Sequence, residues 1–270
     1  MYFVFDIGGT HIRCAVSKNG ESLDKEIKFK TPLFYKEGID LLRRSAGEMA
    51  EGSSFSGIAG GIAGVRDPDT KMFYHSRRPD WEGKDIAKDI AESLGAPCVL
   101  ENDAALAGLA EAVFGAGKDF SIVAYVTVST GVGGARIVDK KIDRNAFGFE
   151  PGHQIIHEGK TLEEWVSGSA FQKRFGKPAE EVHEDAWEEA ATLFSYGLTN
   201  TIVHWSPDIV VLGGPLILKN THMFFERVTK KMHDTMHIFP RIPLFKKAAL
   251  EDRTGLLGAL YMLRNMNFFL

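Results

Sequence analysis

Two short glycine-rich turns, each between two apolar runs, constrain the fold of this chain more than any other feature. The first glycine turn, Asp6–Thr10, follows the apolar run 2–5, and the second glycine turn, Ser129–Gly134, follows the apolar run 122–128. Glycines admit positive φ and let backbone N–H groups approach an anion, and a threonine hydroxyl can donate a further hydrogen bond. Each segment is therefore predicted to be two strands joined by a phosphate-binding turn. An ordinary hairpin would have the same pattern, so one such turn alone would decide little.

The presence of two similar turns indicates duplicated domains that face one nucleotide. Neither turn fits the dinucleotide fingerprint Gly-x-Gly-x-x-Gly, and neither ends in the Gly-Lys-Ser/Thr of a P-loop. The two commonest nucleotide-binding folds are therefore not supported. Asp6, which leads into the first glycine turn, is of the residue type that holds a hydrated magnesium ion.

Length and composition agree with this interpretation and exclude several protein classes. At 270 residues the chain is longer than most single domains and fits two α/β lobes. A net charge of −4 gives no basic surface for nucleic acid. The two cysteines, Cys14 and Cys98, are flanked by apolar residues, which favours buried thiols in a reducing cytosol over a disulfide or a cysteine metal site. With no signal peptide and no membrane-spanning apolar run, the chain is expected to be soluble and cytoplasmic.

The apolar patterning predicts an α/β chain. In the first half we expect an antiparallel meander of strands at 2–6, 11–17 and 24–30, a helix at 35–51, a strand at 56–64, a helix at 85–94, a strand at 98–100 and a helix at 104–114. In the second half we expect strands at 122–128 and 133–138, a helix at 185–203, a strand at 208–212 and helices at 220–235 and 253–265. Gly115–Asp119 is the predicted hinge between the lobes.

Asp103 is the candidate catalytic residue, because it follows a buried strand and begins a helix. Ligands of open α/β sheets gather beyond the carboxyl ends of the strands, and a helix N-terminus favours a carboxylate. The same position is also that of a helix cap, so Asn102 or Asp103 can instead be interpreted as capping the helix.

Six ordered segments resemble the motifs of the ROK sugar kinases, and the resemblance runs from residue 2 to the segment 254–259. They are Asp6–Thr10, Glu101–Ala104, Ser129–Gly134, Glu150–His153, Leu162–Gly168 and Pro207–Gly214. The resemblance implies a two-lobed α/β fold of the actin-like, ribonuclease H-like class, with ATP and Mg²⁺ in the cleft between the lobes and phosphorylation of a sugar hydroxyl. The lobes would be residues 1–116 and 117–252, with a C-terminal helix at about 253–270 packed back on the first lobe.

The resemblance also assigns roles to single residues. Asp103 matches the general base, which would take the proton of the sugar's 6-hydroxyl as that oxygen attacks the γ-phosphate, and Asp6 would hold Mg²⁺ directly or through water. The implied nucleotide contacts are Gly8, Gly9, Thr10, Thr130, Gly131, Gly133, Gly213 and Gly214. The implied sugar contacts are Gly64, Asn102, Glu150, His153 and Glu163. Trp81 is either a further sugar contact or a core or hinge aromatic residue.

The chain departs from the family pattern between His153 and the Leu162-Glu163 pair. Most family members have there a loop of the form Cys-x-Cys-Gly-x-x-Gly-Cys, which holds zinc together with the histidine, whereas Gln154–Leu162 contains no cysteine. A structural zinc site needs about four nitrogen or sulfur ligands, and His157 cannot replace three thiolates. We therefore predict that the protein holds no zinc, and that a protein group orients His153 instead. A shorter loop also changes the sugar pocket, so the resemblance does not select glucose over related hexoses.

Two functions remain open from the sequence. The first is a sugar kinase, since the base, both glycine turns and the magnesium carboxylate are all present. The second is a catalytically silent sugar-binding or regulatory protein, because the family also includes transcriptional repressors. Those repressors carry a helix-turn-helix segment before the kinase-like lobes, and with Asp6 so near the start we expect no such segment here. The family resemblance further implies a homodimer.

Overall fold

The computed structural model describes residues 1–74 and 79–266, and the chain forms two compact units. The first unit consists of Met1–Ala110, Asn145–Gly148 and the segment from Asp252 onward, and the second consists of Glu111–Arg144 and Phe149–Glu251. The division therefore falls inside a helix, six residues before the lobe boundary predicted from the sequence. The last four residues of the predicted C-terminal helix, 267–270, lie outside the described residues. No helix in the described part of the chain is long and apolar enough to cross a membrane.

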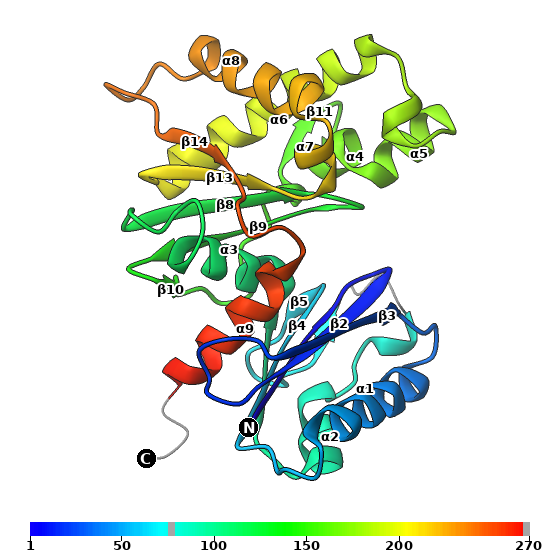
Figure 1. Ribbon diagram of the computed structural model, residues 1–270. Coiled ribbons are helices and arrows are strands. Elements are labelled where there is room, and N and C mark those ends of the chain that lie inside the picture. The colour runs from blue at the N-terminus through cyan, green and yellow to red at the C-terminus, as the bar shows by residue number, and fades with distance from the viewer. Residues whose placement is uncertain (75–78, 267–270) are drawn as a thin grey trace. The chain divides into compact units, whose positions relative to one another are not determined.

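The sheet of the first unit has the strand order β3-β2-β1-β4-β7 (Figure 1). The first three strands form the predicted antiparallel meander, and the other two lie parallel to β1. β4 is buried along its whole length, as parallel strands covered on both faces are. The bounds are β1 Tyr2–Ile7, β2 His11–Ser17, β3 Lys25–Lys30, β4 Gly57–Ile62 and β7 Cys98–Asn102, with a small hairpin of β5 Val65–Arg66 and β6 Phe73–Tyr74.

Helices cover both faces of this sheet. α1 (Tyr35–Ala50) and α2 (Ile86–Leu94) pack on the face of Phe3 and Phe5. α3 (Asp103–Val113) and α9 (Thr254–Asn265) contribute to the hydrophobic cluster on the opposite face, around Val4. α2 has Asp85 as its N-cap, one residue inside the predicted helix, and it ends at Gly95 with a left-handed φ of 68°.

Trp81 is a core residue rather than an exposed sugar contact. Its side chain is 1% exposed, and its ring lies edge-on to Tyr35. Gly38 of α1 leaves the space for the indole, since a Cβ at that position would lie 2.3 Å from the ring. The structure thus decides between the two interpretations that the sequence left open for this residue.

The sheet of the second unit has the order β10-β9-β8-β13-β14, which repeats the arrangement of the first. β10, β9 and β8 are antiparallel, and β13 and β14 lie parallel to β8. The duplication indicated by the two glycine turns is therefore present in the strand topology, with each turn joining the central strand of a sheet to its antiparallel neighbour. The bounds are β8 Ile122–Val128, β9 Val132–Val138, β10 Lys141–Ile142, β13 Ile209–Gly213 and β14 Leu244–Lys247.

One hydrophobic cluster joins the helices of the second unit to its sheet, and it includes Phe194 and Leu198 of α6. Several short elements were not predicted, because segments of two to eight residues carry too little periodicity to be recognised. The helices are α4 Leu162–Val166, α5 Gly168–Phe175, α6 Glu184–Trp205, α7 Pro215–Lys219 and α8 Glu226–Thr235, with a π-helical turn at Thr221–Phe225, and β11 Ile155–His157 pairs with β12 Lys160–Thr161.

The predicted hinge, Gly115–Asp119, is held by two charged side chains of the second unit. The buried carboxylate of Glu111 accepts a hydrogen bond from Ala116 N at 2.9 Å and two more from Ala249 N and Leu250 N, both at 2.8 Å. From the other side Lys140 Nζ donates to the carbonyl oxygen of Ala112 at 2.5 Å and to carbonyls within the segment. The segment is thus hydrogen-bonded rather than loose, and its role as a hinge stays a prediction.

One glycine of α9 and one of α1 provide a matched test of the close packing of α9 on α3. A Cβ on Gly258 would lie 2.0 Å from the carbonyl oxygen of Leu106, whereas a Cβ on Gly47 of α1 would have no atom within 4 Å. We expect Gly258→Ala to lower the free energy of unfolding by about 1–3 kcal/mol because α9 must move off α3. Gly47→Ala should raise it by about 0.5–1 kcal/mol, the usual gain in an exposed helix. Urea denaturation followed by circular dichroism measures both, and equal effects of the two substitutions would contradict the close packing.

Candidate active site

The register of the parallel strands brings the candidate residues of the first unit together. Ile7 pairs with Ile62, and Ile62 pairs with Asn102, so β1, β4 and β7 end at the same level of the sheet. β7 runs two residues further than predicted, because Glu101 and Asn102 continue its pairing with β4. Asp103 is therefore the first residue of α3 and directly follows the strand.

Asp6 is a mostly buried carboxylate with one oxygen that has no hydrogen-bond partner. Its side chain is 16% exposed, and Oδ1 is buried without a partner, while Oδ2 lies 3.7 Å from Nη1 of Arg13. Burial, and secondly the negative charge of Asp103, raise the pKa of Asp6 to about 7, although Arg13 opposes the shift. Two glycines make room for this carboxylate, since a Cβ on Gly61 would lie 3.3 Å from Oδ1 and one on Gly255 would lie 2.9 Å from Cγ.

Asn102 caps α3, and Asp103 lies in its first turn. The side-chain oxygen of Asn102 accepts a hydrogen bond from Ala105 N at 3.0 Å, and its Nδ2 donates to the carbonyl oxygen of Gly64 at 3.0 Å. The capping interpretation thus holds for Asn102, whose amide also ties Gly64, the second residue after β4, to the end of β7. Asp103 accepts a hydrogen bond from Ala104 N at 2.8 Å, so its carboxylate is oriented by the backbone of the helix.

Glu101 was not recognised from the sequence as part of this site. Its carboxylate accepts a hydrogen bond from Asn102 N at 2.8 Å, and burial raises its pKa, while the charge of Arg66 opposes that shift. Glu101 therefore fixes the backbone at the point where β7 passes into α3. A charged residue at the end of an otherwise apolar strand was the available signal.

The first glycine turn is fixed at its base and exposed at its tip. Gly8 N donates to His11 O at 3.0 Å, and the buried Thr31 donates its hydroxyl to Gly8 O at 2.8 Å and its N–H to Thr10 O at 3.0 Å. Gly9 and Thr10 are exposed. Gly8 does not have a positive φ, and the constraint at this position is space, since a Cβ would lie 3.1 Å from His11 O.

The second glycine turn is fixed by residues of α4 and α5. Glu163 accepts a hydrogen bond from Val132 N at 2.8 Å, Gly168 N donates to Ser129 O at 2.8 Å, and Ser169 N donates to Thr130 O at 3.2 Å. Thr130 is exposed, and Gly131 and Gly133 are half-buried. Glu163, which the resemblance assigns to the sugar, therefore also holds the backbone of a turn assigned to the nucleotide.

Gly213 and Gly214 lie against the strand that ends in the second glycine turn. A Cβ on Gly213 would lie 2.5 Å from the Tyr125 hydroxyl, and one on Gly214 would lie 2.3 Å from Val128 O. Gly214 has a φ of 88°, and Gly64 in the first unit has a φ of 129°, so at these two predicted positions the backbone does require glycine.

Glu150 precedes a short 3₁₀ turn, Pro151–His153, that lies on β9, and His153 is its last residue. His153 Nδ1 is 3.3 Å from a carboxylate oxygen of Glu150, and the histidine side chain is 63% exposed. A Cβ on Gly152 would lie 2.2 Å from Val132 O, and a Cβ on Gly134 would lie 2.7 Å from the Pro151 ring. Close backbone packing therefore seats this turn on the strand that follows the second glycine turn.

The predicted residues thus form two groups, one in each unit. The first group is Asp6, Gly8, Gly9, Thr10, Gly64, Asn102 and Asp103, and the second is Thr130, Gly131, Gly133, Glu150, His153, Glu163, Gly213 and Gly214. Among residues 1–74 and 79–266 no group of three or more His, Cys, Asp and Glu side chains is arranged to hold a metal ion.

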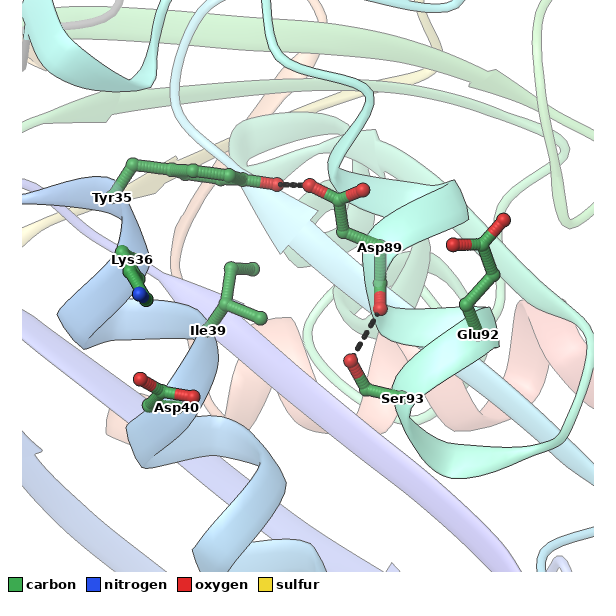
Figure 2. A pocket seen from close by; sticks show the side chains of 7 residues that line it. All are labelled: Tyr35, Lys36, Ile39, Asp40, Asp89, Glu92 and Ser93. Carbon is green, nitrogen blue, oxygen red and sulfur yellow. Dashed lines mark hydrogen bonds between the residues drawn. The ribbon is translucent and has the colours of Figure 1, made fainter.

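A separate groove between α1 and α2 lies apart from these groups (Figure 2). Figure 2 shows the Tyr35 hydroxyl pointing at Asp89, to which it donates a hydrogen bond of 2.6 Å. Ser93 Oγ donates to the backbone carbonyl of Asp89 at 2.6 Å. The groove is an open surface feature of two helices, and none of the predicted site residues lines it.

Comparisons with known proteins identify the family. The sequence profile described as "ROK family" matches residues 2–266. The chain is 27% identical to an N-acetyl-D-glucosamine kinase of Histophilus somni, covering 96% of this chain and 97% of that protein. Its structure resembles a ROK hexokinase from Thermus thermophilus with a TM-score of 0.85 and 25% identity over 97% of each chain. It also resembles a ROK family glucokinase from Streptomyces griseus, solved with glucose and AMPPNP, with a TM-score of 0.83 and 22% identity over 98% of this chain and 99% of that one.

These likenesses agree with the fold class predicted from the sequence, the actin-like ATPase fold with two similar α/β sheets. The family profile spans nearly the whole chain, including both glycine turns and the Asp103 segment. This chain belongs to the ROK family.

Proposed function

We propose that this ROK sugar kinase transfers the γ-phosphoryl group of ATP to a hexose hydroxyl, the 6-hydroxyl of glucose or a related hexose, with Asp103 as general base. The observation that carries the proposal is the pairing of two carboxylates in the first unit. Asp103 begins α3 at the end of β7, and the neighbouring Asp6 has a buried oxygen without a partner. One carboxylate suits proton transfer, and the other suits a cation that accompanies ATP.

The position of Asp103 fits a general base. Its hydrogen bond from Ala104 N fixes the carboxylate, and the helix N-terminus stabilises its negative charge. It would accept the hydroxyl proton as the sugar oxygen attacks phosphorus. A base so placed contributes about 10²- to 10⁴-fold, and positioning of the phosphoryl group supplies much of the remaining acceleration.

The residues around Asp6 fit a magnesium ion. Mg²⁺ usually binds one or two carboxylates and completes its coordination with waters and substrate phosphates. The buried Oδ1 of Asp6, which has no hydrogen-bond partner, is therefore enough as the protein's ligand for this ion. Asp6 would hold the ion directly or through water. Bound there with ATP, the ion would neutralise charge on the phosphate oxygens.

Both glycine turns would bind phosphate through their backbone N–H groups and threonine hydroxyls. Thr31 and Glu163 keep the turns in a fixed conformation, which lowers the entropy cost of binding. Gly213 and Gly214, where no side chain would fit, would lie against the adenosine.

The sugar would be bound by Gly64, Asn102, Glu150, His153 and Glu163. Asn102 already uses its oxygen and one N–H within the first unit, so it has one N–H to offer a sugar hydroxyl. One relative is named for N-acetyl-D-glucosamine and another is named a hexokinase, so both sugar classes are candidate substrates. The homodimer and the cytosolic location expected from the sequence remain predictions.

Replacing Asp103 tests the proposed base. We expect Asp103→Asn to lower turnover by at least about 10²-fold while sugar binding persists, because the amide cannot accept the proton. The measurement is ADP release from Mg-ATP across a panel of hexoses, hexosamines and N-acetylated sugars, with sugar binding followed by calorimetry.

Asp234→Asn is the matched control, because Asp234 is an exposed residue of α8 and its loss should leave turnover unchanged. Sugar binding without turnover in the unaltered protein would instead favour the catalytically silent, sugar-binding alternative.

Replacing Asp6 tests the buried carboxylate in the absence of metal. Its usual pKa is 3.8 and its folded value is about 7, so the protonated form stabilises the fold fully below pH 3.8, and this stabilisation is lost as the pH rises to 7. The loss is at most about 4 kcal/mol. In EDTA, the free energy of unfolding of Asp6→Asn should therefore change less between pH 4 and pH 8 than that of the unaltered protein. At pH 8 the variant should be the more stable of the two. Urea unfolding at several pH values measures this, and identical pH profiles would refute it.

Chelation tests the predicted absence of zinc. We expect full sugar-kinase turnover after a zinc-selective chelator has been applied and removed, provided that Mg²⁺ is present, because Gln154–Leu162 offers no thiolate ligands. Elemental analysis of the purified protein checks the same point directly. A stoichiometric zinc content, with turnover that depends on it, would show the prediction to be wrong.

A further inference from the structure

Gln154, the residue after His153, links the Glu150–His153 turn to α6. Its Nε2 donates hydrogen bonds to Pro151 O at 2.9 Å, Gly197 O at 3.3 Å and Thr201 Oγ1 at 3.2 Å. All three partners accept hydrogen bonds, so the amide nitrogen, and not the oxygen, is the atom that faces them. The amide therefore joins the backbone of the turn to two residues one helical turn apart on α6.

α6 is shaped to receive this amide. Thr201 is 3% exposed and donates its hydroxyl proton to Gly197 O at 2.9 Å, which turns an oxygen lone pair toward Gln154. Leu162 packs over Gly197, where a Cβ would lie 2.5 Å from the leucine side chain, and Leu162 N donates to Gln154 O at 2.8 Å. Gln154 is thus held at its main chain by α4 and at its side chain by α6.

The orientation of His153 depends on the backbone that Gln154 holds. The histidine side chain is 63% exposed, so core packing does little to fix it. Gly152 and Pro151 seat the turn on β9 from one side, and Gln154 ties the same turn to α6 from the other. The backbone of the turn is therefore fixed between a strand and a helix, and the Glu150–His153 pair projects from it.

We propose that Gln154 is a positioning residue, which fixes the Glu150–His153 turn against α6 so that both side chains can bind sugar hydroxyls. The inference rests on the proposed role of Glu150 and His153 in sugar binding. The effect of Gln154 should fall mainly on the sugar, because Glu163 and α5 hydrogen-bond the second glycine turn, whereas the turn that Gln154 holds touches it where Gly152 and Pro151 pack on Val132 and Gly134. Loss of the Gln154 amide should therefore weaken sugar binding much more than nucleotide binding.

Gln154→Met tests the proposal, because methionine keeps the length of the side chain and removes its hydrogen bonds. We expect the KM for the phosphorylated sugar to rise about 10-fold or more, while the KM for ATP stays within about 2-fold. The matched control is Gln172→Met, since Gln172 is the other glutamine of the chain and is exposed on α5. Thr201→Val, which removes one of the acceptors, should raise the sugar KM by less. When Thr201→Val is combined with Gln154→Met, the sugar KM should rise by less than the product of the two separate fold-changes, because both substitutions remove the same hydrogen bond.

Two outcomes of these kinetic measurements would overturn the proposal. One is an unchanged sugar KM in Gln154→Met. The other is an equal rise of the KM for sugar and the KM for ATP, which would show that Gln154 acts only on the stability of the second unit.

A readout independent of turnover separates this proposal from the proposed function. In a protein with ¹³C-labelled histidine, the ring signal of His153, assigned with His153→Asn, should shift or broaden in Gln154→Met and not in Gln172→Met. If the unaltered protein phosphorylates no sugar, the proposed function fails, and this spectrum still decides whether Gln154 positions the turn. An unchanged His153 signal would overturn the positioning role.

Discussion

The parallel register of β1, β4 and β7 is the constraint on which the candidate site of the first unit depends. Two adjacent glycines of β4 fix this register, one on each face of the sheet. A Cβ on Gly60 would lie 2.1 Å from the Phe5 ring, and a Cβ on Gly61 would lie 3.3 Å from the Asp6 carboxylate. A slip of one residue would place Phe5 or Ile7 where Asp6 now lies, since successive side chains point to opposite faces. The same glycines that admit the core aromatic ring therefore also set the position of the proposed magnesium carboxylate.

The second unit repeats the topology of the first but fixes its turn differently. The first glycine turn is closed by Thr31, a buried residue that follows β3, whereas the second is held by Glu163 and the start of α5. Glu163 thereby couples two parts of the proposed site, because the carboxylate assigned to the sugar also accepts the N–H of Val132. Substitution of Glu163 would disturb the nucleotide turn as well as the sugar contacts, so its kinetic effects would not separate the two roles.

The sequence predicted what depends on local pattern and missed what depends on distant contacts. The long helices and both hairpins were predicted to within a few residues, because each has its own apolar periodicity. Gly8 is limited by space rather than by a positive φ, and a sequence does not show which of the two applies to a glycine. Asn102 was assigned to the sugar by resemblance, but its hydrogen bond to Gly64 joins residues 38 positions apart. Gln154 and Gly197 are 43 positions apart, and no local pattern reveals their contact.

Without cysteine ligands, the segment Gln154–Leu162 is held by many weak interactions. A structural zinc ion supplies about 10–16 kcal/mol, whereas a neutral hydrogen bond contributes about 0.5–1.5 kcal/mol net. The hydrogen bonds of Gln154 alone contribute less free energy than a zinc ion would, and further contacts also stabilise the segment. Trp165 donates to His157 O at 3.2 Å, and its ring lies 4.6 Å from both Lys160 Nζ and the Arg174 guanidinium. Because these contacts are spread over α4, α5 and α6, the turn can be fixed only when the second unit is folded, and its order should be lost together with that unit.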